Sequence, residues 1–373
     1  MKIVPSRKQP GIVLLFASAL LIVHVLLAFQ SNVVVSSPSS SSSSSSLSSS
    51  PFTQQQQPAQ AQLMNEIDWS HLTADQLYAL DPAVFKTITP ENLASIPSYA
   101  CSGFRKEQLS QFPEPLPESP CVAFAESCYQ NIRAEAFSGF TQSCIHGIKT
   151  SVFTCTSAQQ FSHLSNGAIL GMRTDQMKSL QSTTCFGITA QQFQVIASND
   201  AYDRLCPAIQ PDCISVIPSQ SIQQMSGVCL QALNRETFGA ISVSQVVHLP
   251  AKSMAYIDRD KMLLWSEQCA GLSTEQFAQV QLSRQQACAG ITKSCISKIL
   301  PDAFTRMKDV CLMMLPPDTV SGFRGIQVSR LNANLFTILS KDQVSKLGAS
   351  SDACSGLKPD QVKQLSQSNV AAC

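Results

Sequence analysis

Cysteine is the residue type whose number and spacing in this sequence point most directly to chemistry. The 373-residue chain contains 15 cysteines. A set of four recurs, with the first cysteines of successive sets 84 or 85 residues apart, and an incomplete set of two lies at the end of the chain. The members of these sets are Cys101, Cys121, Cys128 and Cys144; Cys185, Cys206, Cys213 and Cys229; Cys269, Cys288, Cys295 and Cys311; and Cys354 and Cys373. Cys155 stands outside the pattern.

Cysteines in such sets can form disulfides, bind zinc or pack as small apolar side chains. Zinc sites need cysteines that lie a few residues apart, and no such pair occurs in this sequence. We therefore expect no metal site and no cofactor. The registered sets favour disulfides over simple core packing in a chain that reaches an oxidising compartment.

The pairing of four cysteines has three possible solutions, which a sequence alone does not usually decide. The incomplete set has only one, Cys354 with Cys373. By repeat equivalence, the predicted bridges are Cys101 with Cys121, Cys128 with Cys144, Cys185 with Cys206, Cys213 with Cys229, Cys269 with Cys288, and Cys295 with Cys311. Cys155 is predicted to remain unpaired.

Other residues offer little support for catalysis or for nucleic-acid binding. The five histidines are scattered, and the chain has no nucleophile elbow, phosphate-binding loop or paired-histidine metalloprotease motif. Its 26 basic and 25 acidic residues leave no basic stripe for a nucleic acid. We therefore predict no catalytic residues, no enzymatic activity and no nucleic-acid partner.

The elements that position the cysteines belong to a repeat of about 16 residues, which begins near Trp69 and continues to the end of the chain. We number each repeat from a central Gln or Cys, called position zero. Position zero falls at Gln76, Asn92, Gln108, Cys128, Cys144, Gln160, Gln176, Gln192, Cys213, Cys229, Gln245, Lys261, Gln276, Cys295, Cys311, Gln327, Gln343 and Gln361. Positions −7, −4, +1 and +4 are apolar or Cys, apart from Thr156 at one position −4. This periodicity predicts a continuous buried face.

Each repeat also carries the signals of one short helix. In one of them Thr189 is placed as the N-cap and Gln192 follows at the third helical position, as in a capping box. The other half of the repeat is short and contains Gly, which favours a tight turn or an extended return. The predicted fold is a solenoid of about 18 repeats, each with one capped α-helix of roughly two turns.

Disulfide geometry keeps a second fold open. Bridged Cα atoms lie about 4.4 to 6.8 Å apart, whereas packed helices lie about 8 to 10 Å apart. Parallel strands stack at about 4.8 Å. A leucine-rich-repeat-like α/β coil is therefore the alternative.

Five repeats make up a longer unit, so the repeat region divides into residues 101–184, 185–268, 269–353 and a truncated 354–373. Each complete unit contains one long step, with extra residues at 113–120, 197–205 and 281–287. These insertions either form a row of binding loops or only absorb a mismatch in winding.

The N-terminal region predicts export. A basic tip (1–10), expected to stay in the cytoplasm, precedes an uncharged run (11–29) that is either a signal anchor or a cleaved signal peptide. A Ser- and Gln-rich, low-complexity stalk (30–65) separates it from the repeats (66–373). The repeats are thus expected on the extracellular face, in a protein that is single-pass membrane-anchored or secreted.

One phrase of the repeat resembles a known family. Ile96 and Pro97, and the run Ala136, Phe137, Ser138, Gly139 and Phe140, look like the "IP…AF…G" phrase of BspA-like leucine-rich-repeat proteins. The resemblance implies extracellular binding or adhesion. We predict a non-enzymatic binding or adhesion scaffold for a protein or glycan ligand, with a structural cell-surface coat or matrix protein as the alternative. No ligand-binding residue can be named from the sequence.

Overall fold

The computed structural model describes residues 67–114, 119–198, 201–284 and 286–367. All of them belong to one compact unit, residues 56–373. The predicted basic tip (1–10), membrane segment (11–29) and stalk (30–65) all lie outside the described residues. Within those residues, no helix is both long enough and apolar enough to cross a bilayer.

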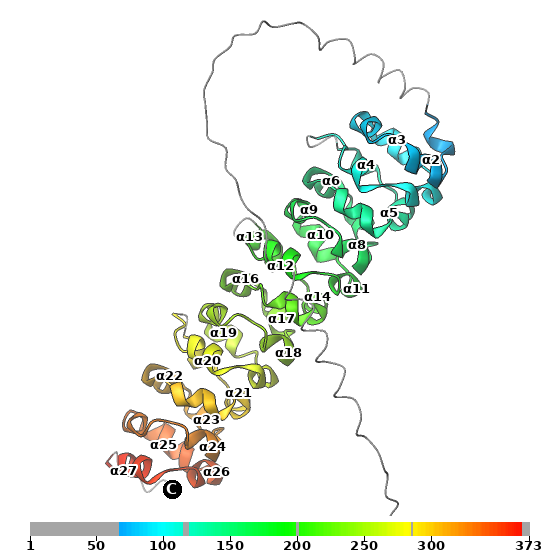
Figure 1. Ribbon diagram of the computed structural model, residues 1–373. Coiled ribbons are helices and arrows are strands. Elements are labelled where there is room, and N and C mark those ends of the chain that lie inside the picture. Colours follow the sequence, from blue (N-terminus) through cyan, green and yellow to red (C-terminus); the bar gives the residue numbers. More distant parts are fainter. Residues whose placement is uncertain (1–66, 115–118, 199–200, 285, 368–373) are drawn as a thin grey trace, which may run out of the picture. The chain divides into compact units, whose positions relative to one another are not determined.

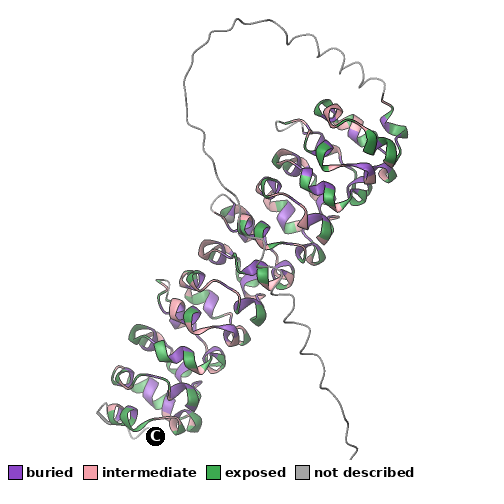
Figure 2. Cartoon of the chain, in the orientation of Figure 1, coloured by how far each residue is buried: buried purple, intermediate pink, exposed green. Residues whose placement is uncertain are grey.

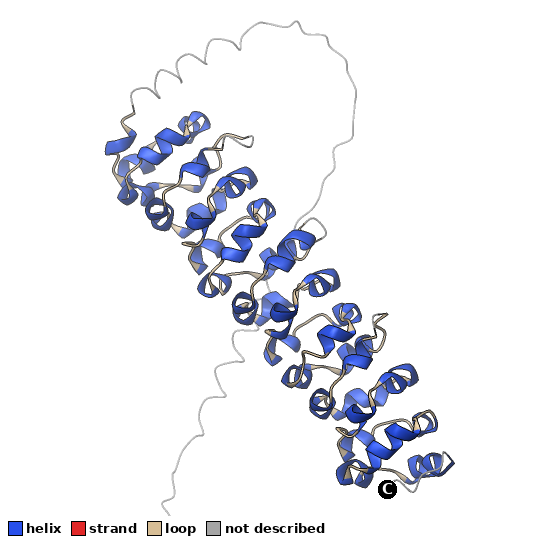
Figure 3. Cartoon of the chain, turned by 180° about the vertical axis from the view of Figure 1, so that it is seen from behind, coloured by secondary structure: helices blue, strands red, loops and turns tan. Residues whose placement is uncertain are grey.

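Every regular element in the described ranges is a helix of three to nine residues (Figure 3). The α-helices are α2 (Ala74–Ala79), α3 (Pro90–Ser95), α4 (Lys106–Leu109), α5 (Glu126–Asn131), α6 (Gln142–Gly147), α7 (Thr150–Phe153), α8 (Ala158–Ser162), α9 (Asn166–Gly171), α10 (Thr174–Ser179), α11 (Ser182–Cys185), α12 (Ala190–Ile196), α13 (Tyr202–Leu205), α14 (Pro211–Val216), α15 (Ser219–Ile222), α16 (Gly227–Ala232), α17 (Arg235–Gly239), α18 (Val243–Val246), α19 (Arg259–Met262), α20 (Thr274–Val280), α21 (Lys293–Lys298), α22 (Asp309–Met314), α23 (Pro317–Val320), α24 (Gly325–Val328), α25 (Lys341–Gly348), α26 (Ser351–Ser355) and α27 (Pro359–Gln367). The 3-10 helices are η1 (Trp69–His71), η2 (Pro82–Thr87), η3 (Ser98–Gly103), η4 (Pro120–Ala123), η5 (Ala134–Gly139), η6 (Cys206–Ala208), η7 (Ala251–Tyr256), η8 (Glu267–Gly271), η9 (Ala287–Gly290), η10 (Pro301–Arg306) and η11 (Ala333–Thr337).

The leucine-rich-repeat-like alternative is not supported, because the described residues contain no strand. The return half of each repeat also differs from the predicted turn or extended segment. It is a further short helix, as in η5 and α9. Segments of this length suit the 3-10 geometry, which closes a hydrogen bond over only three residues.

The short helices pack in a regular order along the chain. When α13 and the adjoining η6 are counted as one element, most helices lie against the third helix before or after them, as in the series α6, α9, α12, α15 and α18. Figure 1 shows the resulting elongated stack of the described helices. Each repeat contains two short helices. A helix therefore packs on a neighbour that is one and a half repeats away along the chain, rather than one repeat away.

The predicted apolar positions form one continuous core, which runs the length of the stack (Figure 2). Phe85, Phe137 and Phe193, all at positions −7 or +1, are fully buried. The N-terminal part of this core is a chain of ring contacts from Trp69 to Phe140. The prediction of a continuous buried face is confirmed.

Gln at position zero joins one helix to another. The predicted capping box of α12 is present: Thr189 N–H donates to Gln192 Oε1 at 3.0 Å, and Gln192 N–H donates to Thr189 Oγ1 at 3.2 Å. The Gln192 Nε2 group also donates to the carbonyls of Phe161 (2.7 Å) and Leu164 (2.9 Å), at the end of a helix two repeats earlier. One side chain thus satisfies backbone groups at the start of one helix and at the end of another.

The same pair of inter-repeat bonds recurs along the stack, at Gln108, Gln160, Gln176, Gln245, Gln276, Gln327, Gln343 and Gln361. In one repeat Lys261 takes the place of this Gln. Its ammonium donates to the carbonyl of Gln231, and burial lowers the pKa of that amine. The pattern indicates that position zero selects side chains that can reach across to an earlier helix.

Glycine at position −5 permits a close backbone approach. A Cβ atom on Gly171 would lie 2.2 Å from the carbonyl oxygen of Gln142, and one on Gly187 would lie 2.1 Å from that of Ala158. In both cases the opposing residue begins the helix two repeats earlier. The Gly that marks the return half is therefore required by packing between repeats.

The predicted disulfide pairing is wrong. Each observed bridge joins the cysteine at position −7 of one repeat to the cysteine at position zero of the next. The six bridges are Cys101 to Cys128, Cys121 to Cys144, Cys185 to Cys213, Cys206 to Cys229, Cys269 to Cys295, and Cys288 to Cys311. Cys354 is also disulfide-bonded, and its predicted partner Cys373 lies outside the described residues.

The order of packing explains the pairing. Cys101 lies on η3, whose third neighbour is α5, and α5 carries Cys128. The predicted partner Cys121 lies on η4, which belongs to a different series of packed helices. The bridged Cα atoms are 5.2 to 5.5 Å apart. Helices fit this distance because their Cα atoms lie about 2.3 Å from the axis, so facing Cα atoms are closer than the axes.

Candidate functional site

Among the residues that the structure describes, the cysteines and histidines singled out by their chemistry do not gather into a reactive site. Twelve of the cysteines are used in the six bridges, and Cys155 is half-buried without a disulfide partner. The described residues contain no group of three or more His, Cys, Asp or Glu placed to hold a metal ion. His163 and His248, which follow the ends of α8 and α18, each bond through Nδ1 to a carbonyl four residues earlier.

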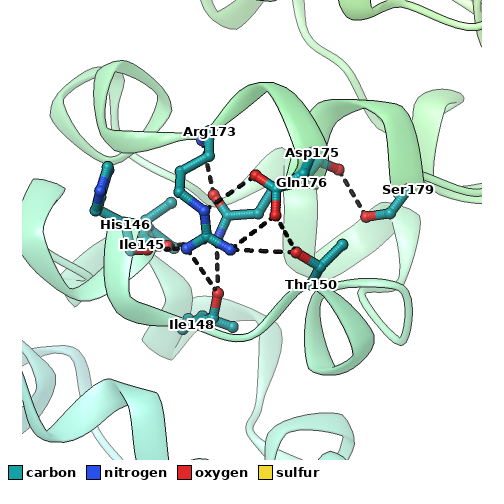
Figure 4. Close-up of polar contacts among 8 residues, drawn as sticks. All are labelled: Ile145, His146, Ile148, Thr150, Arg173, Asp175, Gln176 and Ser179. Atoms are coloured by element: carbon teal, nitrogen blue, oxygen red, sulfur yellow. Dashed lines mark hydrogen bonds and ion pairs between the residues drawn. The ribbon is translucent and has the colours of Figure 1, made fainter.

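The most connected polar cluster in the stack centres on Arg173, which precedes α10 (Figure 4). Its Nε and Nη2 groups donate to the two carboxylate oxygens of Asp175, each at 3.0 Å. Nη2 also donates to Thr150 Oγ1 at 3.1 Å, and Nη1 donates to the carbonyls of His146 and Ile148. All five guanidinium N–H groups are thereby used.

The charges within this cluster compensate each other. The guanidinium of Arg173 holds the pKa of the Asp175 carboxyl well below its usual range, and Thr150 adds a hydrogen bond to the same carboxylate. Arg173 also places a cation at the C-terminal end of α6, where the helix carbonyls carry negative partial charge. The role of Arg173 is therefore to connect α6, α7 and α10.

Arginine at this repeat position, −3, makes a similar bond elsewhere. Arg105 donates to the carbonyl of Leu80 at 3.0 Å, and Arg324 donates to that of Ile299 at 3.4 Å. Each of these carbonyls also accepts from the Gln at position zero of the same repeat. Arginine and glutamine thus share the task of satisfying a helix end.

A surface hollow of about 540 Å³ opens beside the Arg173 cluster. We call it the arginine hollow. Ser143 and His146 line it from α6, Arg173, Thr174 and Asp175 line it from the start of α10, and Arg204 lines it from α13. A pocket of this size is in the range that holds small ligands.

Two further hollows occupy equivalent places in the repeat. The phenylalanine hollow, about 470 Å³, is lined by Gln159 and Ser162 of α8 and by Phe186 and Gly187. The serine hollow, about 580 Å³, is lined by Ser294 and Ser297 of α21 and by Ser321, Gly322 and Arg324.

All three hollows combine positions −1 and +2 of one repeat with positions −6 and −5 of the repeat two places later. Position −6 is Leu170, Phe186 or Ser321, and position +2 is His146, Ser162 or Ser297. The backbone frame is therefore shared, while the chemistry of the lining differs from one hollow to the next.

Sequence reasoning did not find these hollows. Their walls come from repeats that are two places apart, and a contact between such repeats is not visible in the spacing of one repeat. The available signal was the Gly that recurs at position −5, because Gly171, Gly187 and Gly322 each line one of the three hollows. The predicted insertions at 113–120, 197–205 and 281–287 each fall partly outside the described residues. Their described parts include Arg204.

Comparisons with known proteins give no family. No protein-family model matches the chain, and no curated protein matches it either.

Proposed function

We propose that this chain is an exported, disulfide-braced solenoid that acts as a non-enzymatic extracellular binding or adhesion scaffold, with the surface hollows as its subsites. The observation that carries the proposal is the recurrence of one hollow, at the same repeat positions, with different linings. A scaffold that repeats a frame and varies its surface residues is typical of solenoids that bind an extended partner.

The disulfides support the choice of compartment. Six bridges in the described residues indicate a protein that matures in an oxidising environment. The resemblance of the "IP…AF…G" phrase to BspA-like proteins is in keeping with an extracellular role. We further propose that residues 11–29 direct this export, either as a retained single-pass anchor or as a cleaved signal peptide.

The linings support a binding role over a catalytic one. The phenylalanine hollow exposes 66% of the Phe186 side chain beside small and polar residues. The arginine hollow presents the guanidinium of Arg204, and the serine hollow presents hydroxyl groups. An extended protein or glycan that crossed several hollows would meet a different recognition element at each of them.

The test is a binding screen with the full chain expressed in a secreting host. Recovery of the chain from the medium would indicate a cleaved signal peptide, whereas recovery from labelled cell surfaces would indicate an anchor. The purified chain is then screened against glycan and protein arrays. We expect a saturable ligand, and Ser162→Trp or Ser297→Trp, which fill two of the hollows, should weaken its binding about tenfold or more.

Gln181→Trp is the matched control, because Gln181 is exposed and lines none of the three hollows. Equal binding by all three variants would show that the hollows are not subsites. Polymerisation of the chain without any array ligand would instead favour the structural coat or matrix role.

A further inference from the structure

The two arginines of the arginine hollow differ in how their donors are used. All five N–H groups of Arg173 are bonded within the protein, as described above. Arg204 makes one bond, from Nη2 to the carbonyl of Leu170 at 3.0 Å. Among the described residues no carboxylate forms an ion pair with Arg204. Arg204 is thus held at the hollow with most of its donors unused.

The charge balance of the hollow calls for an anion. Arg173 and Asp175 neutralise each other within their cluster. Arg204 then remains as an uncompensated cation at the same hollow. A guanidinium with free donors binds a carboxylate through two parallel hydrogen bonds, which are among the stronger polar contacts in proteins.

The remaining lining suits a ligand that is rich in hydroxyl groups. The side chains of Ser143, His146 and Thr174 line the hollow and make no hydrogen bond within the described residues. They offer donors and acceptors in several directions. The one large apolar side chain in the lining is Leu170. Peptides are usually anchored by apolar pockets or by an exposed strand edge, and this hollow provides neither.

We propose that the arginine hollow binds a hexuronic acid, with the guanidinium of Arg204 holding its carboxylate and with Ser143, His146 and Thr174 contacting its hydroxyl groups. This assignment rests on the proposed binding function and names the ligand class of one of its subsites. The acid can be a free sugar or one residue of an acidic polysaccharide, since both present the same carboxylate and hydroxyl groups. Arg204 belongs to the insertion 197–205, which gives that insertion a role in ligand binding.

The test measures binding of tetragalacturonate to the full, disulfide-intact chain by titration calorimetry at low salt. We expect Arg204→Gln to weaken binding roughly 10- to 100-fold, because a hydrogen-bonded charge is lost. The affinity of Arg204→Lys should lie between that of the parent chain and that of Arg204→Gln, because lysine keeps the charge and loses the paired donors. Arg235→Gln is the matched control, because Arg235 is an exposed arginine of α17 that lines none of the three hollows.

Three further probes complete the experiment. The methyl ester of tetragalacturonate lacks the carboxylate charge. Its binding to the parent chain should be as weak as the binding of tetragalacturonate to the Arg204→Gln variant. Monomeric galacturonate distinguishes a free sugar from a polymer, and measurable binding of either form supports the assignment. Binding of tetraglutamate as tight as that of tetragalacturonate would overturn it in favour of an acidic peptide.

The assignment also fails if Arg204→Gln binds tetragalacturonate as the parent chain does while its unfolding midpoint is unchanged. In that case, binding of an array ligand that is weakened by Ser162→Trp or Ser297→Trp would still support the broader binding function. Conversely, the parent chain could bind uronate in a manner that depends on Arg204 and yet bind no array ligand. That result would support this site and contradict the extended-ligand function.

Discussion

At the scale of single residues, one buried hydroxyl accounts for the exception in the repeat. Tyr129 is fully buried, and its hydroxyl lies 3.2 Å from Thr156 Oγ1. Thr156 in turn donates to the carbonyl of Phe153 at 2.8 Å, so the Tyr129 hydroxyl is the donor in the first bond. Burial raises the pKa of Tyr129, which keeps its hydroxyl protonated. The polar residue at this position −4 is there to accept from a tyrosine two repeats earlier.

Thr156→Val is expected to destabilise the chain by about 1–3 kcal/mol, because it leaves the buried Tyr129 hydroxyl without an acceptor. Adding Tyr129→Phe should recover most of that loss, since the unpaired hydroxyl is then removed. The measurement is urea unfolding of the two single variants, the double variant and the parent under non-reducing conditions. A double variant no more stable than Thr156→Val would refute the pairing.

At the scale of elements, short helices are stable here because they pack on their third neighbours and because many of them carry a side-chain cap. Isolated helices of four to nine residues are marginal in water. The glycine at position −5 sets how closely a return segment can approach the helix beneath it. Gly187 and Gly167 provide a comparison, since a Cβ on Gly187 would lie 2.1 Å from the Ala158 carbonyl, whereas one on Gly167 meets nothing nearer than Ser165 Oγ at 3.9 Å.

Gly187→Ala is expected to lower stability by about 1–3 kcal/mol, because the segment after α11 that contains Gly187 must move away from the start of α8. Gly167→Ala should be neutral or stabilising by up to about 1 kcal/mol, because alanine favours the helical backbone. Thermal unfolding of both variants, oxidised throughout, provides the comparison. Similar losses in the two would show that the close approach at Gly187 is not required.

The capped helices could be predicted from the sequence, whereas their neighbours could not. Thr189 and Gln192 were sufficient to place α12, because a capping box is a local signal. The second role of Gln192, at Phe161 and Leu164, depends on a helix two repeats away. The predicted disulfides paired equivalent positions of adjacent repeats, whereas the observed bridges join position −7 of one repeat to position zero of the next. This difference follows from the packing order, which the spacing of a single repeat does not show. The candidate hollows depend on this packing order as well, so no single repeat reveals them.

At the scale of the whole described unit, stabilising contacts are distributed unevenly along the stack. Aromatic contacts are continuous from Trp69 to Phe140. Ion pairs between stacked helices occur toward the C-terminus, as between Lys298 and Glu267 and between Lys346 and Asp318. These pairs are exposed, and such pairs contribute little. The disulfides are therefore stronger links between helices than these ion pairs, and they occur in the segments 101–144, 185–229 and 269–311.

Reduction is expected to loosen those three segments before the unbridged residues between 230 and 268. Each bridge closes a loop of 23 to 28 residues, a constraint that contributes about 3 to 4 kcal/mol in the chain-entropy description. Repeats that contact only near neighbours can lose structure locally. Hydrogen exchange with and without a reductant provides the measurement. A uniform loss of protection along the chain would indicate that the unit unfolds as a whole.

Packing on the third neighbour also bears on how such a chain can grow. Capped helices and return segments alternate along the sequence, and taking every third element of an alternating series gives an alternating series again. A duplicated 16-residue repeat therefore meets the same two kinds of interface wherever it is inserted, and the cap, the glycine and the glutamine need no redesign. An insertion of half a repeat would instead place like segments against each other. Gene duplication can thus change the length of the molecule freely, but only in whole repeats.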